Sequence, residues 1–366
     1  MRAAIARQGQ IVIDEIADPK PGPGQVLVKT RACGICGSDL HTLQHGAKAA
    51  DAARRSGSFF RIDPRRDFVL GHEFCAEVVD YGPGTERRFK PGTLVCSEPV
   101  IADARGLEPL GFSNDAPGGY AQYMNLMEGL LIEVPSSLSP ELASLTEPIA
   151  VGVHAVGRAN LDAKHGAVVV GCGPVGLAII GALRAADVRP IIAVDFSEAR
   201  RKLALRLGAD VIVDPRVHSP YEDFRDLAQV DPAHGQVRPL WRPGPSLKPQ
   251  AIFECVGVPG VIQQVMEGAE PGAQIIVVGV CMEPDSIEPM FAINKELDLK
   301  FAFGHSQDEF AAALRHIAEG SLEAEVLLTG VTGLDGVASA FEALESADSH
   351  AKIVIDPWRA GGLERR

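Results

Sequence analysis

The feature that most limits the folds open to this chain is a series of alternating strand-like and helix-like segments between residues 167 and 280. The first, Ala167-Val168-Val169-Val170, is continuously apolar, which is typical of a parallel strand covered on both faces. Similar runs lie at 191–195, 210–214, 252–255 and 274–280, with helical patterns at 175–186, 197–207 and 261–269. Strands that alternate with helices form a doubly wound parallel sheet, so we predict an α/β fold here.

A glycine motif opens the first helix of this predicted sheet. Gly171-Cys172-Gly173-Pro174-Val175-Gly176 directly follows the first strand, and Asp195 closes the next one. In this context the glycines let the backbone turn tightly and approach a pyrophosphate at a helix N-terminus, where the dipole favours anions. Asp195 would accept bonds from ribose hydroxyls and repel a 2′-phosphate. We therefore predict a Rossmann domain over residues 155–295 that binds NAD, with NADP kept as the less favoured cofactor because of Arg200 and Arg201.

The residues before this domain show a strand pattern without helical periodicity. Residues 11–14 and 25–30 are rich in β-forming side chains, and proline and glycine mark the turn between them. We predict a mostly β domain over residues 1–154. Residues 296–366 are expected to return to it and to end in a strand at 352–355.

Two segments depart from these patterns. Residues 215–250 contain seven prolines and one short helical pattern, and a lid, an oligomer contact and a surface excursion all stay open as interpretations. The segment between His45 and Phe68 is polar, and we expect a solvated loop whose charges are partly neutralised by Asp51, Asp63 and Asp67. The alternative is that some of its arginines bind an anionic substrate group. These arginines are Arg54, Arg55, Arg61, Arg65 and Arg66.

Groups suited to a catalytic zinc lie in two short stretches. Cys36-Gly37-Ser38-Asp39-Leu40-His41 brings a thiolate, a hydroxyl, a carboxylate and an imidazole together, and Gly71-His72-Glu73 adds a second imidazole beside a carboxylate. A catalytic zinc takes three protein ligands and leaves one position open. Cys33 is expected in the core, because no second Cys-x-x-Cys completes a four-thiolate site. A metal that holds an oxygen and a cofactor that takes a hydride together suggest an alcohol dehydrogenase.

Five motifs then give the chain a resemblance, nearly end to end, to the zinc-dependent medium-chain dehydrogenases, which include alcohol, polyol and threonine dehydrogenases. Three are quoted above, at residues 36–41, 71–73 and 171–176. The others are Glu147-Pro148 and Phe253-Glu254-Cys255-Val256-Gly257. The resemblance implies that the mostly β domain is GroES-like and catalytic.

The resemblance also implies a ligand set for the metal. Cys36 and His72 would bind the catalytic zinc, and Asp39 would orient the ligand histidine. Glu147 falls at the third ligand position, bound directly or through water, although Thr146-Glu147-Pro148 is also a good helix start. Glu73 would lie near the metal and ligate it in some states.

The proton path and the cofactor contacts are implied in the same way. Ser38 would take the alcohol proton and His41 would pass it to solvent, while Lys352 would contact the cofactor pyrophosphate. Besides the glycine motif, the other expected cofactor contacts are Asp195, Arg200, Val256 and Val278.

The four cysteines of the family's structural zinc lobe are absent after Cys96, so we predict one zinc per chain and no structural zinc. The reaction implied is hydride transfer from an alcohol to NAD, and a glutamate at position 147 favours secondary alcohols or polyols. Two alternatives stay open. One is a zinc-free NADPH-dependent quinone or enone reductase on the same fold, and the other is a non-catalytic NAD-binding protein.

Charge and cysteine content set further limits. The net charge of −13 argues against a general nucleic-acid or membrane-surface binder, which would need excess lysine and arginine. Seven cysteines in 366 residues fit a reduced compartment, so a cytoplasmic location is expected. The most apolar stretch, residues 167–183, is interrupted by glycine and proline, which argues against a membrane span. The family habit implies a homodimer or homotetramer and small-molecule alcohol or ketone substrates.

Overall fold

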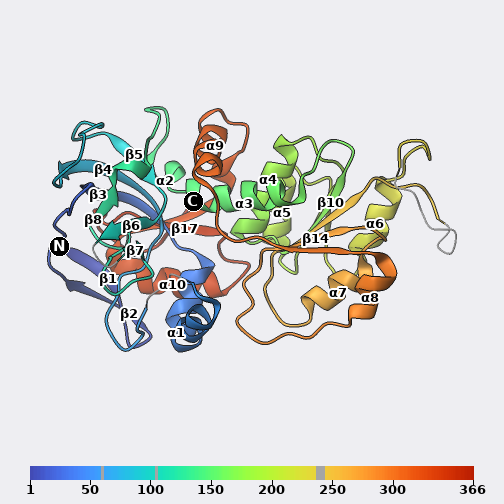
Figure 1. The fold of residues 1–366 in the computed structure, drawn as a ribbon, viewed down its shortest axis with the longest axis horizontal. Helices are drawn as coiled ribbons and strands as arrows, with labels where there is room; N and C mark the ends of the chain where they lie inside the picture. Colours follow the sequence, from blue (N-terminus) through green and yellow to red (C-terminus); the bar gives the residue numbers. More distant parts are fainter. Residues whose placement is uncertain (59–61, 104–105, 236–243) are drawn as a thin grey trace. The chain divides into compact units, whose positions relative to one another are not determined.

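The structure is a computed structural model that describes residues 1–58, 62–103, 106–235 and 244–366 (Figure 1). The chain divides into two compact units. The first comprises Met1–Glu147, Phe310–Gly320 and Leu328–Arg366, and the second comprises Pro148–Glu309 and Ser321–Leu327. Helices α3 (Thr146–Ala159) and α9 (Gln307–Ala318) each begin in one unit and end in the other.

The first unit is built on an eight-stranded sheet in the order β18-β16-β17-β3-β4-β5-β9, with β8 also paired to β3. The pairing is antiparallel except between β16 and β17. Its strands are β3 (Gln25–Gly34), β4 (Glu73–Tyr81), β5 (Leu94–Ser97), β8 (Tyr123–Met127), β9 (Leu131–Glu133), β16 (Leu328–Thr332), β17 (Lys352–Ile355) and β18 (Glu364–Arg365). This sheet confirms the predicted mostly β domain.

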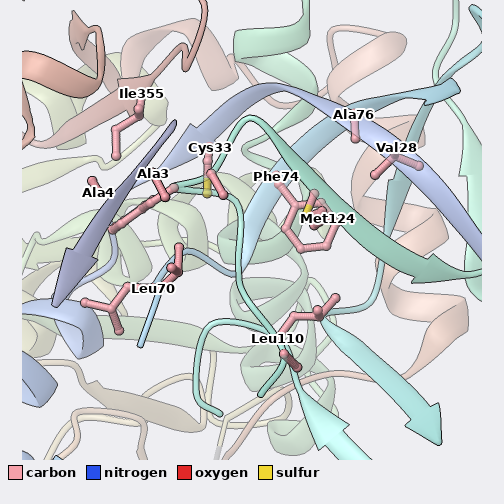
Figure 2. Packing of buried hydrophobic residues seen from close by; sticks show 14 of the residues in the cluster. Ala3, Ala4, Val28, Cys33, Leu70, Phe74, Ala76, Leu110, Met124 and Ile355 are labelled. Atoms are coloured by element: carbon pink, nitrogen blue, oxygen red, sulfur yellow. The ribbon is translucent and has the colours of Figure 1, made fainter. Parts of the chain in front are cut away.

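Smaller elements complete this unit. Among the described residues, β1 pairs with β2 and β6 pairs with β7, both antiparallel. The bounds are β1 (Arg2–Arg7), β2 (Gln10–Glu15), β6 (Val100–Asp103), β7 (Gly106–Pro109), η1 (Glu128–Leu130), α2 (Pro140–Ala143), η3 (Leu334–Gly336) and α10 (Val337–Glu345). Alternate side chains of β3 point inward, so the sheet carries a continuous core. Figure 2 shows part of this core, including Ala3, Cys33, Phe74, Met124 and Ile355, all buried.

The predicted loop after His45 is wrong over its first part. Helix α1 runs from Gly37 to Ser56, with one non-helical residue at His45, and Gly57 ends it in the left-handed conformation at φ 72°. The segment holds several alanines among its charges, and alanine has the highest helix propensity. Few large apolar residues mark an inward face, which is why periodicity did not reveal the helix.

The second unit is a six-stranded parallel sheet in the order β12-β11-β10-β13-β14-β15. Its strands are β10 (Gly166–Val170), β11 (Ile191–Val194), β12 (Val211–Val213), β13 (Gln250–Glu254), β14 (Gln274–Val277) and β15 (Asp298–Phe301). The strand order reverses between β10 and β13, the place where doubly wound sheets bind their ligands. The predicted Rossmann sheet is therefore confirmed.

Helices connect these strands, with α4 and α5 packed together beside β10 and β11 (Figure 1). The helices are α4 (Pro174–Ala185), α5 (Glu198–Leu207), α6 (Pro220–Leu227), α7 (Val261–Gly268), α8 (Pro289–Lys295) and η2 (Ala324–Val326). The core between strands and helices includes Val168, Ile192, Phe224, Ile252 and Ile275.

The structure moves two expected boundaries. The first stretch of the first unit ends at Glu147 and not at residue 154. Strand β15 pairs with β14 in the parallel sheet, so the chain returns to the first unit at Phe310 and not at residue 296. The proline-rich stretch 215–250 contains α6 and is tied back to the sheet unit where it ends, because Leu247 is buried and the Lys248 ammonium donates to two carbonyls. Its residues 236–243 lie outside the described part. None of the helices described here has the length and apolarity needed to cross a membrane.

Candidate metal and cofactor sites

Three predicted ligand residues converge in the first unit. The ligand atoms of Cys36, His72 and Glu73 all lie within 4.8 Å of one another. The antiparallel pairing of β3 and β4 explains this, because Gly34 at the end of β3 faces Glu73 at the start of β4. Cys36 follows β3 by two residues and is the N-cap residue of α1. Its thiol lies close to His72 there. A thiolate, an imidazole and a carboxylate form a donor set that zinc accepts.

Glycine is required at two positions beside this cluster. A Cβ on Gly34 would lie 2.1 Å from Oε2 of Glu73, and Gly71 has a φ of +103° with its Cβ position 2.5 Å from the ring of Tyr120. A side chain at either position would displace a group of the site. These glycines let the backbone pass close to the buried carboxylate and the buried phenol.

Asp39 links the ligand histidine to a buried tyrosine. Its Oδ1 lies 3.4 Å from Nδ1 of His72, while its Oδ2 accepts bonds from the Tyr120 hydroxyl at 2.6 Å and the Cys36 N–H at 2.9 Å. With Asp39 on Nδ1, Nε2 of His72 is the nitrogen left for a metal. Tyr120 was quoted in no predicted motif for this role, and its sequence position gives no signal, because it reaches Asp39 only through the fold.

The charges of the cluster perturb each other. Burial disfavours the charged form of His72, but Asp39 and Cys36 outweigh it, so the pKa of His72 lies well above its usual range. Burial raises the pKa of Glu73, an effect that Lys352 opposes and Glu147 reinforces. Within the described chain, Asp39 Oδ1 and His72 Nδ1 are buried without a well-formed hydrogen bond. A bound cation would balance this set of anionic donors, so the residues present fit zinc.

Glu147 stands in the first turn of α3 and is partly buried. Its charge is close enough to raise the pKa of both Glu73 and Lys352. Among the residues that the structure describes, however, the converging set contains Glu73 and not Glu147. The role of Glu147 as a ligand, direct or through water, stays a prediction.

Lys352 lies beside the metal cluster. Its side chain is buried in the first unit, and its Nζ donates to both oxygens of Glu73, at 2.6 and 2.7 Å, and to the Ile35 carbonyl at 2.9 Å. An ammonium has three N–H donors, and all three are used. Lys352 is therefore a partner of Glu73, and its contact with a cofactor pyrophosphate stays a prediction.

Ser38 and His41 lie one turn apart at the start of α1, on the same side of the helix. Ser38 is partly buried and His41 is exposed. Partial desolvation and the neighbouring His45 lower the pKa of His41. This order, from buried to exposed, is compatible with a proton path to solvent, and the relay itself stays a prediction.

The glycine motif of the second unit has the geometry expected from its sequence. A Cβ on Gly176 would lie 1.9 Å from the Gly171 carbonyl oxygen, and Gly171 itself has a φ of +95°. Gly173 caps α4, with Pro174 in the first turn. The loop therefore turns tightly at the end of β10 and leads its N–H groups into a helix N-terminus.

Asp195 is held against this loop by two backbone bonds. Its Oδ2 accepts from the Cys172 N–H at 2.7 Å and its Oδ1 from the Ser197 N–H at 2.8 Å. Of the two neighbouring arginines, Arg201 donates to the carbonyls of residues 195 and 196. Nη1 of Arg200 lies 4.0 Å from the Cβ position of Gly173, so Arg200 is the arginine that reaches the glycine loop.

Glu254 ends β13, the strand next to β10 where the strand order reverses, and it bonds to the loops that follow β13 and β14. Its buried carboxylate accepts from the N–H groups of Val256 and Gly257, at 2.7 and 2.9 Å. Its carbonyl accepts from Val278 and Gly279. Val256 is 41% exposed beside the glycine loop, so an apolar side chain is presented there.

The arginine hypothesis loses its support over the described residues. Arg54 and Arg55 pair with Asp51, Arg65 pairs with Asp63, and Arg66 pairs with Asp115, all at the surface. Arg61 lies outside the described residues. The solvated, neutralised interpretation of this segment therefore holds for four of the five arginines.

Comparison with known proteins covers both units. Residues 22–136 match the alcohol dehydrogenase GroES-like domain, and residues 174–319 match the zinc-binding dehydrogenase domain. The chain is 35% identical over 360 residues to (R,R)-butanediol dehydrogenase of Bacillus subtilis, which covers 96% of this chain and 97% of that protein. The crystal structure of the Bacillus subtilis 2R,3R-butanediol dehydrogenase superposes with a TM-score of 0.79 over 97% of this chain and 99% of that one, at 32% identity.

Two further relatives extend the comparison. Sorbitol dehydrogenase of Bos taurus is 29% identical, covering 91% of this chain and 90% of that protein. A structure from Sinorhizobium meliloti 1021 bound to NADP has a TM-score of 0.77 at 26% identity and covers 97% of this chain and 99% of that one. These matches confirm the predicted fold class and an oxidoreductase of the alcohol dehydrogenase type that uses zinc and a nicotinamide cofactor. The chain belongs to the zinc-dependent medium-chain dehydrogenase family.

Proposed function

We propose that this protein oxidises a secondary alcohol or polyol to a ketone, with transfer of a hydride to NAD, at a centre where Cys36, His72 and Glu73 hold one zinc per chain. The observation that carries the proposal is the convergence of these three ligands within 4.8 Å. The names of its relatives, butanediol and sorbitol dehydrogenases, support a substrate with neighbouring hydroxyl groups.

Zinc bound there supplies a Lewis acid that lowers the pKa of the alcohol oxygen. The protein groups do the rest of the positioning. Asp39, held by Tyr120, keeps His72 in one orientation. Ser38 accepts the alcohol proton, and His41 passes it on to solvent from the exposed side of the same helical turn.

The cofactor preference is proposed from the end of β11. Both oxygens of Asp195 are oriented by backbone N–H groups, and each keeps a lone pair for a ribose hydroxyl. A fixed carboxylate at that place repels a 2′-phosphate, which favours NAD. Arg200 reaches the same loop and provides the route by which NADP would be accepted.

The test is a zinc and substrate assay on protein purified without chelator. Elemental mass spectrometry should give close to one zinc per chain, and NAD should be reduced with vicinal diols or polyols. Zinc near two per chain would contradict the predicted lack of a structural site. Zinc near zero with NADPH-dependent reduction of enones would favour the zinc-free reductase, and cofactor binding without turnover would favour the non-catalytic protein.

We also infer a homodimer formed through the second unit. Strand β15 is the last strand of its sheet, so one side of its backbone lacks a strand partner in the described chain. Phe301 and Phe303 are 63% and 70% exposed there, and Met290 and Ile293 of α8 are 62% and 69% exposed. An open apolar edge of this kind pairs readily with a second copy. Light scattering should give a dimer mass, and Phe301→Lys should shift it toward the monomer.

A further inference from the structure

The buried pair of Glu73 and Lys352 has a feature that the proposed chemistry leaves unused. The two side chains are 0% and 1% exposed. Glu73 begins β4 and Lys352 begins β17, which flank β3 on opposite sides in the sheet. A lysine is almost never fully buried unless it is paired, and here the Lys352 ammonium donates to the Glu73 carboxylate and to the Ile35 carbonyl.

The same carboxylate belongs to two groups at once. Its oxygens lie 2.6 and 2.7 Å from Nζ of Lys352. One of them also lies within 4.8 Å of the ligand atoms of Cys36 and His72. A Glu73 oxygen that bound zinc would form a weaker hydrogen bond to the Lys352 ammonium. The metal and the ammonium would therefore compete for the same carboxylate.

The ammonium also places a positive charge beside the cation site. Like charges repel strongly where water is excluded, because the effective dielectric constant is low there. The charge of Lys352 therefore opposes the binding of a metal cation beside Glu73.

We propose that Lys352 is a positioning residue that competes with the zinc for Glu73 and so limits zinc affinity. Glu73 is thereby kept exchangeable between an ion pair and a metal ligand. This rests on the proposed zinc at Cys36, His72 and Glu73.

The experiment measures zinc affinity by competition with a chelator, on full-length metal-free protein. In Lys352→Met the ammonium is gone and the volume is nearly kept, so zinc should bind roughly tenfold or more tightly. Disruption of the site by a damaged fold would weaken binding, so a gain is diagnostic. Lys295→Met is the matched control, because Lys295 of the second unit donates to three backbone carbonyls; its zinc affinity should equal that of the wild type.

A second pair of variants separates competition for Glu73 from charge repulsion, and Lys352→Gln, which is also uncharged, replaces Lys352→Met throughout if that variant does not fold. Glu73→Gln leaves the ammonium beside the metal, whereas the double variant Glu73→Gln/Lys352→Met removes both charges and buries no unpaired ion. Competition for Glu73 predicts that the double variant gains little zinc affinity over Glu73→Gln alone, because no carboxylate is left for which the ammonium competes. A gain as large as that of Lys352→Met over the wild type would show charge repulsion alone and would overturn the proposal.

The affinity for NAD tests the other interpretation, in which Lys352 contacts the cofactor pyrophosphate. If Lys352→Met weakens NAD binding by tenfold or more and leaves zinc affinity unchanged, Lys352 acts on the pyrophosphate and the competition does not exist. If the wild-type protein binds no zinc at all, the proposed function fails first. The two failures are thus distinguished in one series of titrations.

Discussion

The metal cluster and the glycine loop are built in opposite ways. The metal cluster is made of side chains from separate segments, with Asp39 and Tyr120 bonded across 81 residues and Glu73 and Lys352 across 279. The glycine loop is made of backbone from one contiguous stretch, where a Cβ on Gly176 would strike the carbonyl of Gly171. Side-chain sites therefore depend on the whole fold of a domain, whereas a backbone loop depends on a few neighbouring residues.

The largest effect is expected from removing a ligand of the metal cluster. Cys36→Ser replaces a thiolate with a poor zinc ligand, so the zinc content should fall to near zero and NAD reduction to background. Elemental mass spectrometry and a turnover assay measure both. Cys281→Ser, in the second unit, is the control and should keep full zinc; a zinc-loaded, active Cys36→Ser protein would remove Cys36 from the ligand set.

The proton path is the next largest effect. Ser38→Ala removes the hydroxyl proposed to take the substrate proton, and kcat should fall roughly a hundredfold or more. Zinc content and the Kd for NAD should not change, because neither depends on that hydroxyl. Ser56→Ala at the end of the same helix is the control. Near wild-type turnover of Ser38→Ala would place proton removal elsewhere.

Two substitutions in the glycine loop should have different effects, one on the stability of the fold and the other on cofactor binding. Gly176→Ala forces a Cβ against a backbone oxygen, and the free energy of unfolding should fall by about 3 kcal/mol. Gly173→Ala meets no protein atom closer than 4.0 Å. Its stability should stay within about 1 kcal/mol of the wild type, while its NAD affinity falls. Thermal unfolding and cofactor titration compare the two, and equal stability losses would contradict the assignment.

The smallest effect is expected at Tyr120. Tyr120→Phe keeps the ring packed against Phe341 but removes the bond to Asp39. Zinc affinity should fall by roughly tenfold, as is typical when an outer partner of a ligand histidine is lost. Tyr123→Phe, on the solvent-facing Trp358 contact, is the control. Unchanged zinc affinity in Tyr120→Phe would show that Asp39 needs no such support.

The parallel sheet and the glycine loop were predictable because their signals are local. Strands β10 and β11 are apolar throughout and β13 is apolar at its centre, and Gly176 and Asp195 lie at defined places after β10 and β11. The helix after His45 was missed because its charges and alanines show no clear inward face. Strand β15 was assigned to the wrong unit because the sequence of a short strand does not indicate which sheet it joins.

The metal ligands were also predictable by residue type, but their arrangement was not. The sequence by itself determined that Cys36, His72 and a nearby carboxylate belong together, because these donor types match a metal. Only the tertiary structure decided that Tyr120 stands behind Asp39 and that Lys352 is bound to Glu73. The reason is physical: these contacts are made between buried side chains of different strands, whose neighbours are set by sheet order and register and not by distance along the chain.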